Sequence, residues 1–450
     1  MAYYILKSYK LNLEPMRIFG AFAGQKRCFF LDSSLYPGRY SFLGADPFYV
    51  LESGRDDPLP ELRKNLDRYK ITLTGNAPPF LGGAVGHLAY DLGFALEKKF
   101  KNRQRPKNPV PDFSFGFYNT MIAIDHLKKL LYIFAAGFPE KDYRLQKALC
   151  RRNFRKIQKL LSEAASSQNS LKDKSVNVGA SAESNFTKEA YMAAVRRAKE
   201  YIKKGDIYQV NLAQVFRART DLSAPQIYKR LRKFSPSCFG AYIDYGDYQI
   251  LSSSPEAFLR LERGRVTTRP MKGTRPRSKN KALDIKLKED LIASAKDKAE
   301  LMMIVDLERN DLGRVCSYDS IKVSRLRQLE KYSTVFQTTA TVYGCLHKNQ
   351  DRVDLIRACF PGGSITGCPK IRAMEIIDEL ETRRRSIYTG SLGYLSFSGG
   401  MDLNILIRTI LKKDKELYFG VGGGIVADSK PEEEYRETLV KAKGMMQAIK

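Results

Sequence analysis

The chain has 450 residues, 43% of them hydrophobic and including 24 Phe and 25 Tyr, a composition that excludes a disordered chain and allows one to three domains. Its 77 Lys and Arg residues outnumber 49 Asp and Glu, which gives a formal net charge of +28. Such an excess suits nucleic acid, an anionic membrane or an acidic substrate. The basic residues are spread along the chain and accompany no RNA-binding motif, zinc finger or recognition helix, so nucleic-acid binding is kept only as a rival hypothesis.

The N-terminal region, residues 1–162, contains strand-like runs separated by Gly and Pro and ends in a basic helix at about 141–162. Its first residues show no signal-peptide pattern. The longest apolar run, Leu130–Phe138, is shorter than the roughly 20 residues that a membrane span needs. Residues 163–186 are rich in Ser, Ala, Asn and Lys without apolar periodicity, which predicts a flexible linker.

The region from residue 187 to 450 alternates between helical and strand-like patterns. Thr187 is expected to cap a helix that ends at Gly205, and residues 207–216 alternate as a strand. The later elements are expected as strands at 239–250 and 256–268 with an Arg263-Gly264 hairpin, helices at about 284–305 and from Pro369, strands at 388–397 and 403–411, and a last helix from about Pro431. Hairpins grouped between helices predict an α+β fold and not a doubly wound parallel sheet.

The cysteines and histidines narrow the chemistry further. Seven Cys, odd in number and dispersed without a CxxC pair, exclude a disulfide framework and a zinc ribbon. They fit a reducing compartment, and we therefore expect a cytoplasmic protein. With only three His, a transition-metal site is not expected.

A first candidate site lies in the segments SPEAFLR (254–260) and PMKGTRPR (270–277). Glu256 follows a Pro turn and enters a strand, and Lys272 occupies a turn in which Gly273 permits close backbone approach and Thr274 offers a hydroxyl and an amide. A Lys and a Glu that converge on one pocket can serve as nucleophile and general acid. Nearby cations would favour the neutral amine if they were also close in space, and the candidates are Arg269, Arg275 and Arg277. From spacing alone, a surface lysine in a basic loop is the alternative.

A second candidate site consists of acidic residues in two predicted helices. Glu300 lies among apolar residues, where a carboxylate needs a partner or a cation. After the triple glycine Gly422–Gly424, whose amides can face an anion, Glu434, Glu437 and Lys441 share one helical face. Mg²⁺ prefers a few carboxylates with water and substrate oxygens, so Glu300 with Glu434 or Glu437 is a candidate Mg²⁺ site. A solvated Glu437–Lys441 pair is the alternative.

The segment YTGSLGYLSFSGGMDLNILIRT (388–409) is expected to place Asp402, Asn404, Leu406 and Arg408 on one face of a strand. If Arg408 faces inward, its guanidinium suits bidentate recognition of a carboxylate. An exposed strand arginine is the alternative.

Together these segments resemble the chorismate-utilising enzymes, which include anthranilate synthase, aminodeoxychorismate synthase, isochorismate synthase and salicylate synthase. The resemblance implies a layered α+β fold, with two large, mainly antiparallel sheets packed together, helices outside and the active site between the sheets. It also implies an N-terminal domain over 1–162 and a chorismate-binding catalytic region over 187–450. The segments that carry it are GRYSFLGADP (38–47), GDIYQVNLAQ (205–214), SPEAFLR (254–260), KGTRPR (272–277), AELMMIVDLERNDLGRV (299–315), PGGSITGCPK (361–370), TGSLGY (389–394), IRT (407–409) and GGGIVADSKPEEEYRETLVKAK (422–443).

Two positions distinguish the branches of this family. Gln209 stands where isochorismate and salicylate synthases carry a water-activating lysine, so ammonia becomes the expected nucleophile. Lys272 stands where anthranilate synthases usually have alanine and aminodeoxychorismate synthases have lysine. The resemblance is therefore closest to aminodeoxychorismate synthase component I, with anthranilate synthase component I as the alternative.

The resemblance implies a mechanism. Mg²⁺ held by Glu300, Glu434 and Glu437 would bind the ring carboxylate of chorismate, Lys272 would attack C2, and Glu256 would protonate the departing C4 hydroxyl. Ammonia would then add at C4 to give 4-amino-4-deoxychorismate, a precursor of p-aminobenzoate and folate. Because the chain has no Cys-centred glutaminase elbow, a separate glutamine amidotransferase is implied. The implied substrate contacts are Gln209, Gly273, Thr274, Tyr394, Arg408, Gly422, Gly423, Gly424 and Lys441.

The sequence departs from the family pattern at two places. Gln337 occupies a position where both amino-transferring types usually carry His, and Leu301 replaces another frequent His. Loss of a proton carrier near the substrate disfavours a pyruvate-eliminating step and hence anthranilate formation. It also leaves open a weakened, non-catalytic protein that binds chorismate or nucleic acid.

Overall fold

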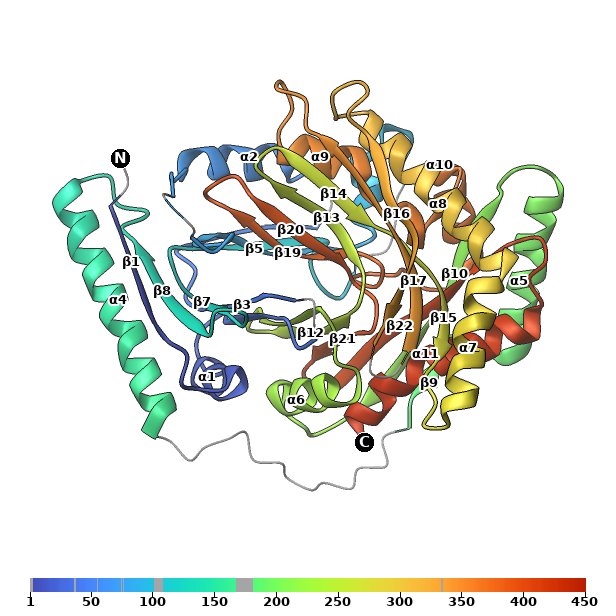
Figure 1. Cartoon of the computed structure of the whole chain (residues 1–450), viewed down its shortest axis with the longest axis horizontal. Helices are drawn as coiled ribbons and strands as arrows, with labels where there is room; N and C mark the ends of the chain where they lie inside the picture. Colours follow the sequence, from blue (N-terminus) through green and yellow to red (C-terminus); the bar gives the residue numbers. More distant parts are fainter. Residues whose placement is uncertain are drawn as a thin grey trace.

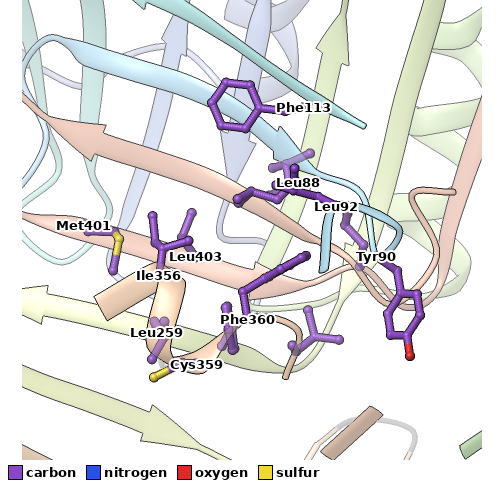
Figure 2. Close-up of a cluster of buried hydrophobic side chains, with 14 of the residues drawn as sticks. Leu88, Tyr90, Leu92, Phe113, Leu259, Ile356, Cys359, Phe360, Met401 and Leu403 are labelled. Carbon is purple, nitrogen blue, oxygen red and sulfur yellow. The ribbon is translucent and has the colours of Figure 1, made fainter. Parts of the chain in front are cut away.

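The computed structural model describes residues 3–450 apart from 36–37, 55, 74, 76, 101–107, 167–180 and 333–334. In this part of the chain the strands form two large sheets in which neighbouring strands run antiparallel, with helices on the outside (Figure 1). Buried side chains of both sheets share one large hydrophobic cluster, part of which is shown in Figure 2, and a second cluster joins one of the sheets to the helices outside it. The layered α+β fold expected from the sequence is confirmed.

Each sheet combines strands from distant parts of the sequence. In spatial order, the twelve-stranded sheet of the described residues comprises β1 (Tyr4–Lys10), β8 (Leu130–Ala136), β7 (Thr120–Asp125), β3 (Tyr40–Gly44), β2 (Phe29–Asp32), β11 (Phe239–Asp244), β12 (Tyr248–Ser254), β21 (Thr409–Lys413), β22 (Glu416–Ile425), β10 (Gln209–Arg219) and β18 (Gly367–Cys368), with β9 (Glu183–Ser184) also on β10. The ten-stranded sheet, counted over the same residues, comprises β15 (Met271–Pro276), β17 (Val335–Cys345), β14 (Arg265–Arg269), β13 (Ala257–Glu262), β20 (Met401–Ile405), β19 (Ser391–Ser396), β5 (Gly83–Leu88), β6 (Phe113–Tyr118) and β4 (Tyr49–Ser53), with β16 (Lys322–Lys331) on β17.

The helices cover the outer surfaces of both sheets. Helices α4 and α1 pack together beside β1 and β8, α11 packs on β22, α5 and α6, and α8 lies against β15 and β17 (Figure 1). Their bounds are α1 (Pro15–Phe22), α2 (Leu59–Arg68), α3 (Leu92–Leu96), α4 (Tyr143–Ser166), α5 (Lys188–Lys203), α6 (Ala224–Phe234), α7 (Lys281–Ala293), α8 (Ala295–Gly313), α9 (Arg352–Cys359), α10 (Lys370–Leu380) and α11 (Pro431–Ile449), with short 3₁₀ turns η1 (Lys98–Phe100) and η2 (Gly363–Ile365). Among the described residues, no helix is long and apolar enough to cross a membrane.

Both sheets contain strands from the two sides of the predicted linker. Strand β2 pairs with β11, and β5 pairs with β19. The two ends of the linker belong to regular elements, because α4 continues to Ser166 and β9 pairs with β10. The middle of the linker, 167–180, lies outside the described residues, as does most of the basic run 98–107.

Several local predictions are confirmed. The hydroxyl of Thr187 accepts a hydrogen bond from the backbone N–H of Ala190 at 3.1 Å, so this residue caps α5 as expected. Arg263 and Gly264, with φ of 51° and 79°, form the hairpin between β13 and β14. Positive φ at both central residues is the requirement of a type I′ turn, one of the common two-residue hairpin connections.

Other predictions were wrong in detail. The helix expected at 284–305 is two helices, because Ser294 adopts an extended conformation and its side chain caps α8 through Asp297. The strand expected at 403–411 is interrupted, so Asp402 and Asn404 lie on β20 while Arg408, with φ of 50°, lies between β20 and β21. These residues therefore do not share one strand face.

The pairing of β10 with β22 positions the glycine-rich segment. Ten residue pairs join the strands, from Val210 with Ile425 to Arg219 with Glu416, and Asn211 lies opposite Gly424. A side chain at Gly422 is excluded by backbone, because its Cβ would lie 2.6 Å from the carbonyl oxygen of Leu212.

A buried ion pair fixes the edge of β10. The guanidinium of Arg385 is 2.7 Å from Glu381 Oε1 and donates hydrogen bonds to the carbonyl oxygens of Asn211 at 2.7 Å and Ile365 at 2.9 Å. Both side chains are almost fully buried. Thus two of the three consecutive arginines at 383–385 are bound to acidic groups, since Arg384 also lies near Asp91 at 3.3 Å.

Arg385→Leu should destabilise the fold by about 3–5 kcal/mol, because it leaves the Glu381 carboxylate buried without its cation. Urea unfolding followed by circular dichroism measures this loss. The control is Arg197→Leu, which removes an exposed pair with Glu200 and should change stability little. Equal losses in the two variants would contradict the structural role of the buried pair.

Candidate functional site

Lys272 lies where three elements meet. It is on β15, its side chain is 14% exposed, and its Nζ is 3.9 Å from Glu300 Oε2 on α8. A Cβ added at Gly424 would lie 3.2 Å from this Nζ and 3.1 Å from Gln209 Nε2. Any side chain at position 424 would therefore displace the amine, and the structure brings Lys272, Glu300, Gln209 and Gly424 together.

Gln209 presents a buried amide without partners. Its side chain has no solvent exposure, and neither amide atom has a hydrogen-bond partner in the described part of the chain. Leaving such a group unsatisfied costs about 1–3 kcal/mol. Because the amide faces Gly424 and Lys272, it is available to a ligand bound there. It stays neutral and cannot act as a strong base.

The acidic face of α11 reaches the same strand end. Pro431 starts this helix, and Glu434 Oε2 and Glu437 Oε1 would lie 3.1 Å and 3.8 Å from a Cβ added at Gly423. Lys441 Nζ is 2.7 Å from Glu437 Oε1 and donates a hydrogen bond to the carbonyl oxygen of Gly422 at 2.8 Å. The predicted helical face is thus turned toward the triple glycine.

The pKa values of the two α11 carboxylates shift in opposite directions. Burial raises the pKa of Glu434, and the neighbouring Glu437 adds to this, while a hydrogen bond at 2.7 Å from the Ser429 hydroxyl opposes it. Burial also acts to raise the pKa of Glu437, but Lys441, Lys272 and Lys296 together outweigh it, so this pKa is lowered. A divalent cation at this position would favour the ionised form of both groups.

Glu256 is a buried carboxyl suited to hold a proton. It follows β12, and its Oε1 accepts a hydrogen bond from the Ser364 hydroxyl at 2.8 Å. Burial raises its pKa, while Ser364, Lys272 and Lys441 act in the opposite direction. Glu256 therefore lies within electrostatic reach of both lysines.

The three arginines near Lys272 are engaged elsewhere. Arg269 is paired with Glu330, Arg275 is 3.1 Å from Asp297, and Arg277 is 2.8 Å from Asp284. Each of these arginines is neutralised by its own carboxylate, so the three together do not form the cationic environment that the sequence suggested for Lys272. The nearest ion-pair partner of Lys272 is the carboxylate Glu300.

Gly273 and Thr274 extend the site along β15. Gly273 has φ of 74°, and a Cβ added there would lie 2.8 Å from Leu291 Cδ1, so both conformation and space require glycine. The Thr274 hydroxyl accepts a hydrogen bond from Gln337 Nε2 at 3.3 Å. Gln337 therefore lies beside the site, as its place in the sequence suggested.

Arg408 offers a guanidinium for an anion. Burial lowers its pKa, and the nearby Tyr332 acts in the opposite direction. A desolvated guanidinium gains from an anionic partner, so Arg408 is a candidate contact for a carboxylate.

Tyr394 lies apart from these residues. Its ring stacks on Phe80 with centroids 4.4 Å apart, and it lines a separate cavity of about 1,030 Å³. Asp402 and Asn404 line that cavity too, whereas Lys272, Glu256 and Glu300 do not. The structure therefore does not bring Tyr394 to the candidate site.

Sequence reasoning missed three nearby residues. Tyr388 lies within electrostatic reach of Glu256, Ser364 binds Glu256 directly, and Lys296 Nζ is 4.0 Å from Glu300 Oε1. The spacing of Lys296 and Glu300, four residues apart in one helix, is a signal that was present in the sequence. Ser364 lies in the motif PGGSITGCPK and Tyr388 begins the segment 388–409, but neither pattern shows that these side chains lie near Glu256.

The carboxylates fit Mg²⁺ in chemistry. Glu300, Glu434 and Glu437 supply only oxygen ligands, the type that Mg²⁺ prefers. Glu434 and Glu437 converge at Gly423, and Glu300 faces the ammonium groups of Lys272 and Lys296. Within the described residues, no three His, Cys, Asp or Glu side chains lie close enough together to hold a metal ion in this arrangement.

Comparison with known proteins identifies what the chain is similar to. Residues 26–447 match the family described as chorismate binding enzyme. The chain is 38% identical over 436 residues to anthranilate synthase component 1 of Aquifex aeolicus, covering 92% of this chain and 86% of the relative. It is also 38% identical over 398 residues to aminodeoxychorismate synthase component 1 of Salmonella typhimurium, covering 88% and 83%. The crystal structure of anthranilate synthase component I from Streptococcus pneumoniae superposes with a TM-score of 0.80 at 30% identity, covering 97% and 99%.

The raised pKa of Glu256 predicts a pH-dependent stability. A carboxyl whose pKa is higher in the folded than in the unfolded state makes stability fall as pH rises above its ordinary range. Glu256→Gln cannot ionise and should lose less stability between pH 5 and pH 8 than the wild type. Urea unfolding of both proteins at both pH values measures the difference, and parallel losses would contradict the prediction.

Proposed function

The chain belongs to the chorismate binding enzyme family, and we propose that it is an aminodeoxychorismate synthase component 1. It would convert chorismate and ammonia to 4-amino-4-deoxychorismate. The single observation that carries the proposal is the place of Lys272, whose amine lies inside the candidate site beside Gly424, Gln209 and Glu300.

The proposed reaction uses two residues in sequence. The Lys272 amine attacks C2 of chorismate while the bond from C4 to its hydroxyl breaks. Both ring double bonds shift, from C1=C2 to C1=C6 and from C5=C6 to C4=C5. Glu256 donates the proton with which the hydroxyl leaves as water, a role suited to a buried carboxyl with a raised pKa. Ammonia then adds at C4 and the lysine leaves C2, which restores the free amine.

The substrate would be held by cationic side chains and by backbone groups near the C-terminal end of β22. Arg408 offers its guanidinium to a carboxylate, and Lys441 and the Gly422–Gly424 backbone lie beside the other anionic groups. Glu300, Glu434 and Glu437 would hold Mg²⁺. The bound ion would supply a Lewis acid for a substrate carboxylate. Gln209, a neutral amide, would bind substrate without activating water.

Anthranilate synthase component 1 is the second candidate. The relative from Aquifex aeolicus and the solved structure from Streptococcus pneumoniae both carry that name. Formation of anthranilate requires loss of pyruvate and does not need a nucleophilic lysine, so in this case Lys272 would be dispensable.

Both candidates use ammonia, and we propose that a separate glutamine amidotransferase subunit supplies it. The name component 1, given to relatives of both types, supports a second subunit. Free ammonium at high concentration would replace that subunit in the test tube.

Incubation of the protein with chorismate, Mg²⁺ and ammonium should give 4-amino-4-deoxychorismate, which an added lyase converts to p-aminobenzoate. Lys272→Ala should lose this product by at least about 10²-fold, because the covalent route is removed. Chromatography with mass detection measures both products. Lys298→Ala, which changes an exposed lysine of α8, is the control and should keep wild-type activity. Fluorescent anthranilate that persists in Lys272→Ala would refute this function and support the second candidate.

Glu434→Gln and Glu437→Gln should each weaken Mg²⁺ binding by about 10–100-fold, since each removes an ionised ligand. Calorimetric titration of Mg²⁺ in the presence of chorismate measures the affinity. Glu433→Gln is a matched control on the same helix, because Glu433 is exposed and paired with Lys430. Loss of affinity in this control, or none in the other two variants, would show that the ion binds elsewhere.

A further inference from the structure

A second cavity, of about 540 Å³, lies at the middle of β22, where the strand passes Tyr388. Its lining includes Val215 of β10, Gly420 of β22, and Tyr388. None of Lys272, Glu256 and Glu300 lines it, and neither the function nor the substrate contacts proposed above use it. We call it the rear cavity.

The rear cavity and the candidate site lie along one face of the same strand pair. Val215 is opposite Gly420, and Asn211 is opposite Gly424. Because side chains alternate along a strand, Gly420 and Gly424 present the same face, about 13 Å apart at about 3.3 Å per residue. Gly422 lies between them, so no side chain of β22 occupies this face from the rear cavity to Lys272.

Tyr388 belongs to the lining of the rear cavity and is also close to the candidate site. A Cβ added at Gly420 would lie 2.2 Å from its ring, so the ring lies directly on this glycine. The hydroxyphenyl group is buried and lies within electrostatic reach of Glu256. Tyr388 therefore lines the rear cavity and also lies near the proposed general acid.

Buried polar groups without partners mark the route. Within the described residues, the hydroxyls of Tyr90 and Ser386 in the rear cavity have no hydrogen-bond partner, nor do Asn211 Oδ1 and the amide of Gln209. Asn211 Oδ1 would be 3.0 Å from a Cβ at Gly422, which places it on the same bare face. Figure 2 shows the Tyr90 hydroxyl directed away from the apolar core. Four such groups are expensive to bury unless a polar molecule visits them.

The charges of the rear cavity balance. Glu381 and Arg385 form the buried ion pair described above, Arg384 lies near Asp91, and the remaining charged lining residues are Arg383 and Asp378. Such a lining provides no excess charge to hold an ion. With neutral hydroxyl and amide groups beyond it, the route suits a small, uncharged molecule that donates hydrogen bonds.

We propose that the rear cavity is the entrance through which ammonia reaches the site, with Tyr388 as its inner wall and the glycine face of β22 as its floor. The inference rests on the proposed function, because ammonia is the co-substrate of that reaction. With a separate entrance, ammonia can reach C4 while bound chorismate fills its own binding site. The exposed rim residues Thr382 and Arg383 form the surface over which the ammonia-producing subunit would deliver it.

Val215→Phe tests the entrance, because it places a larger side chain opposite Gly420 without changing a residue of the proposed chemistry. The KM for ammonium should rise at least tenfold, while the KM for chorismate and the Mg²⁺-dependent affinity for chorismate change less than twofold. Val215→Ala, which widens the same point, should keep the wild-type KM for ammonium. Val215→Leu adds less volume and should give an intermediate KM for ammonium. It replaces the Phe variant in this test if that variant does not fold.

The outcomes separate the two proposals. If the wild type aminates chorismate and folded Val215→Phe keeps the wild-type KM for ammonium, the entrance is refuted and the proposed function stands. If the product is anthranilate, the function assigned above is refuted, whereas the rise in KM for ammonium still supports the entrance. A wild type that uses no ammonia in either reaction overturns both.

Discussion

The antiparallel pairing of β10 with β22 is the interaction on which the site depends. It places the unpartnered amide of Gln209 beside Gly424, and it directs the chain from β22 into α11, which carries Glu434 and Glu437. Glycines on β22 let side chains from other elements approach the strand backbone closely. Lys272, from the other sheet, uses this space. Chemistry that the sequence distributes over the second half of the chain therefore meets at the end of one strand pair.

Much of the fold could be predicted because local physics determines it. The Thr187 cap and the Arg263-Gly264 hairpin depend on neighbouring residues only, and both are confirmed. The break at Ser294 was missed because helical periodicity continues through it, while the side-chain cap on Asp297 that ends one helix and starts the next leaves no periodic pattern. The interruption before Thr409 was missed because no local pattern marks the positive φ of Arg408, whose carbonyl oxygen accepts a hydrogen bond from the distant Ser253 N–H.

The candidate site was predictable as a set of residues but not as an arrangement. Motif order identified Lys272, Glu256 and the α11 carboxylates, and the structure brings these together. The order of the motifs could not show which tyrosine of the 388–394 segment faces the site. Strand β19 starts only after Thr389, which has a positive φ, and this change of direction separates Tyr388 from Tyr394. Nor could motif order show that each nearby arginine has its own carboxylate, since those partners come from distant segments.

The sharing of both sheets by the two halves of the chain has a consequence for biosynthesis. Strand β2 has β11 as a neighbour, and β5 lies between β6 and β19, so the N-terminal strands lack part of their pairing until the second half exists. A domain whose strands all come from one continuous segment can fold while the ribosome still extends the chain. Here the N-terminal strands would emerge with unpaired edges and exposed apolar faces. Completion of the sheets has to wait for β19, β21 and β22 near the C-terminus, so the nascent chain depends on protection from aggregation for most of its synthesis.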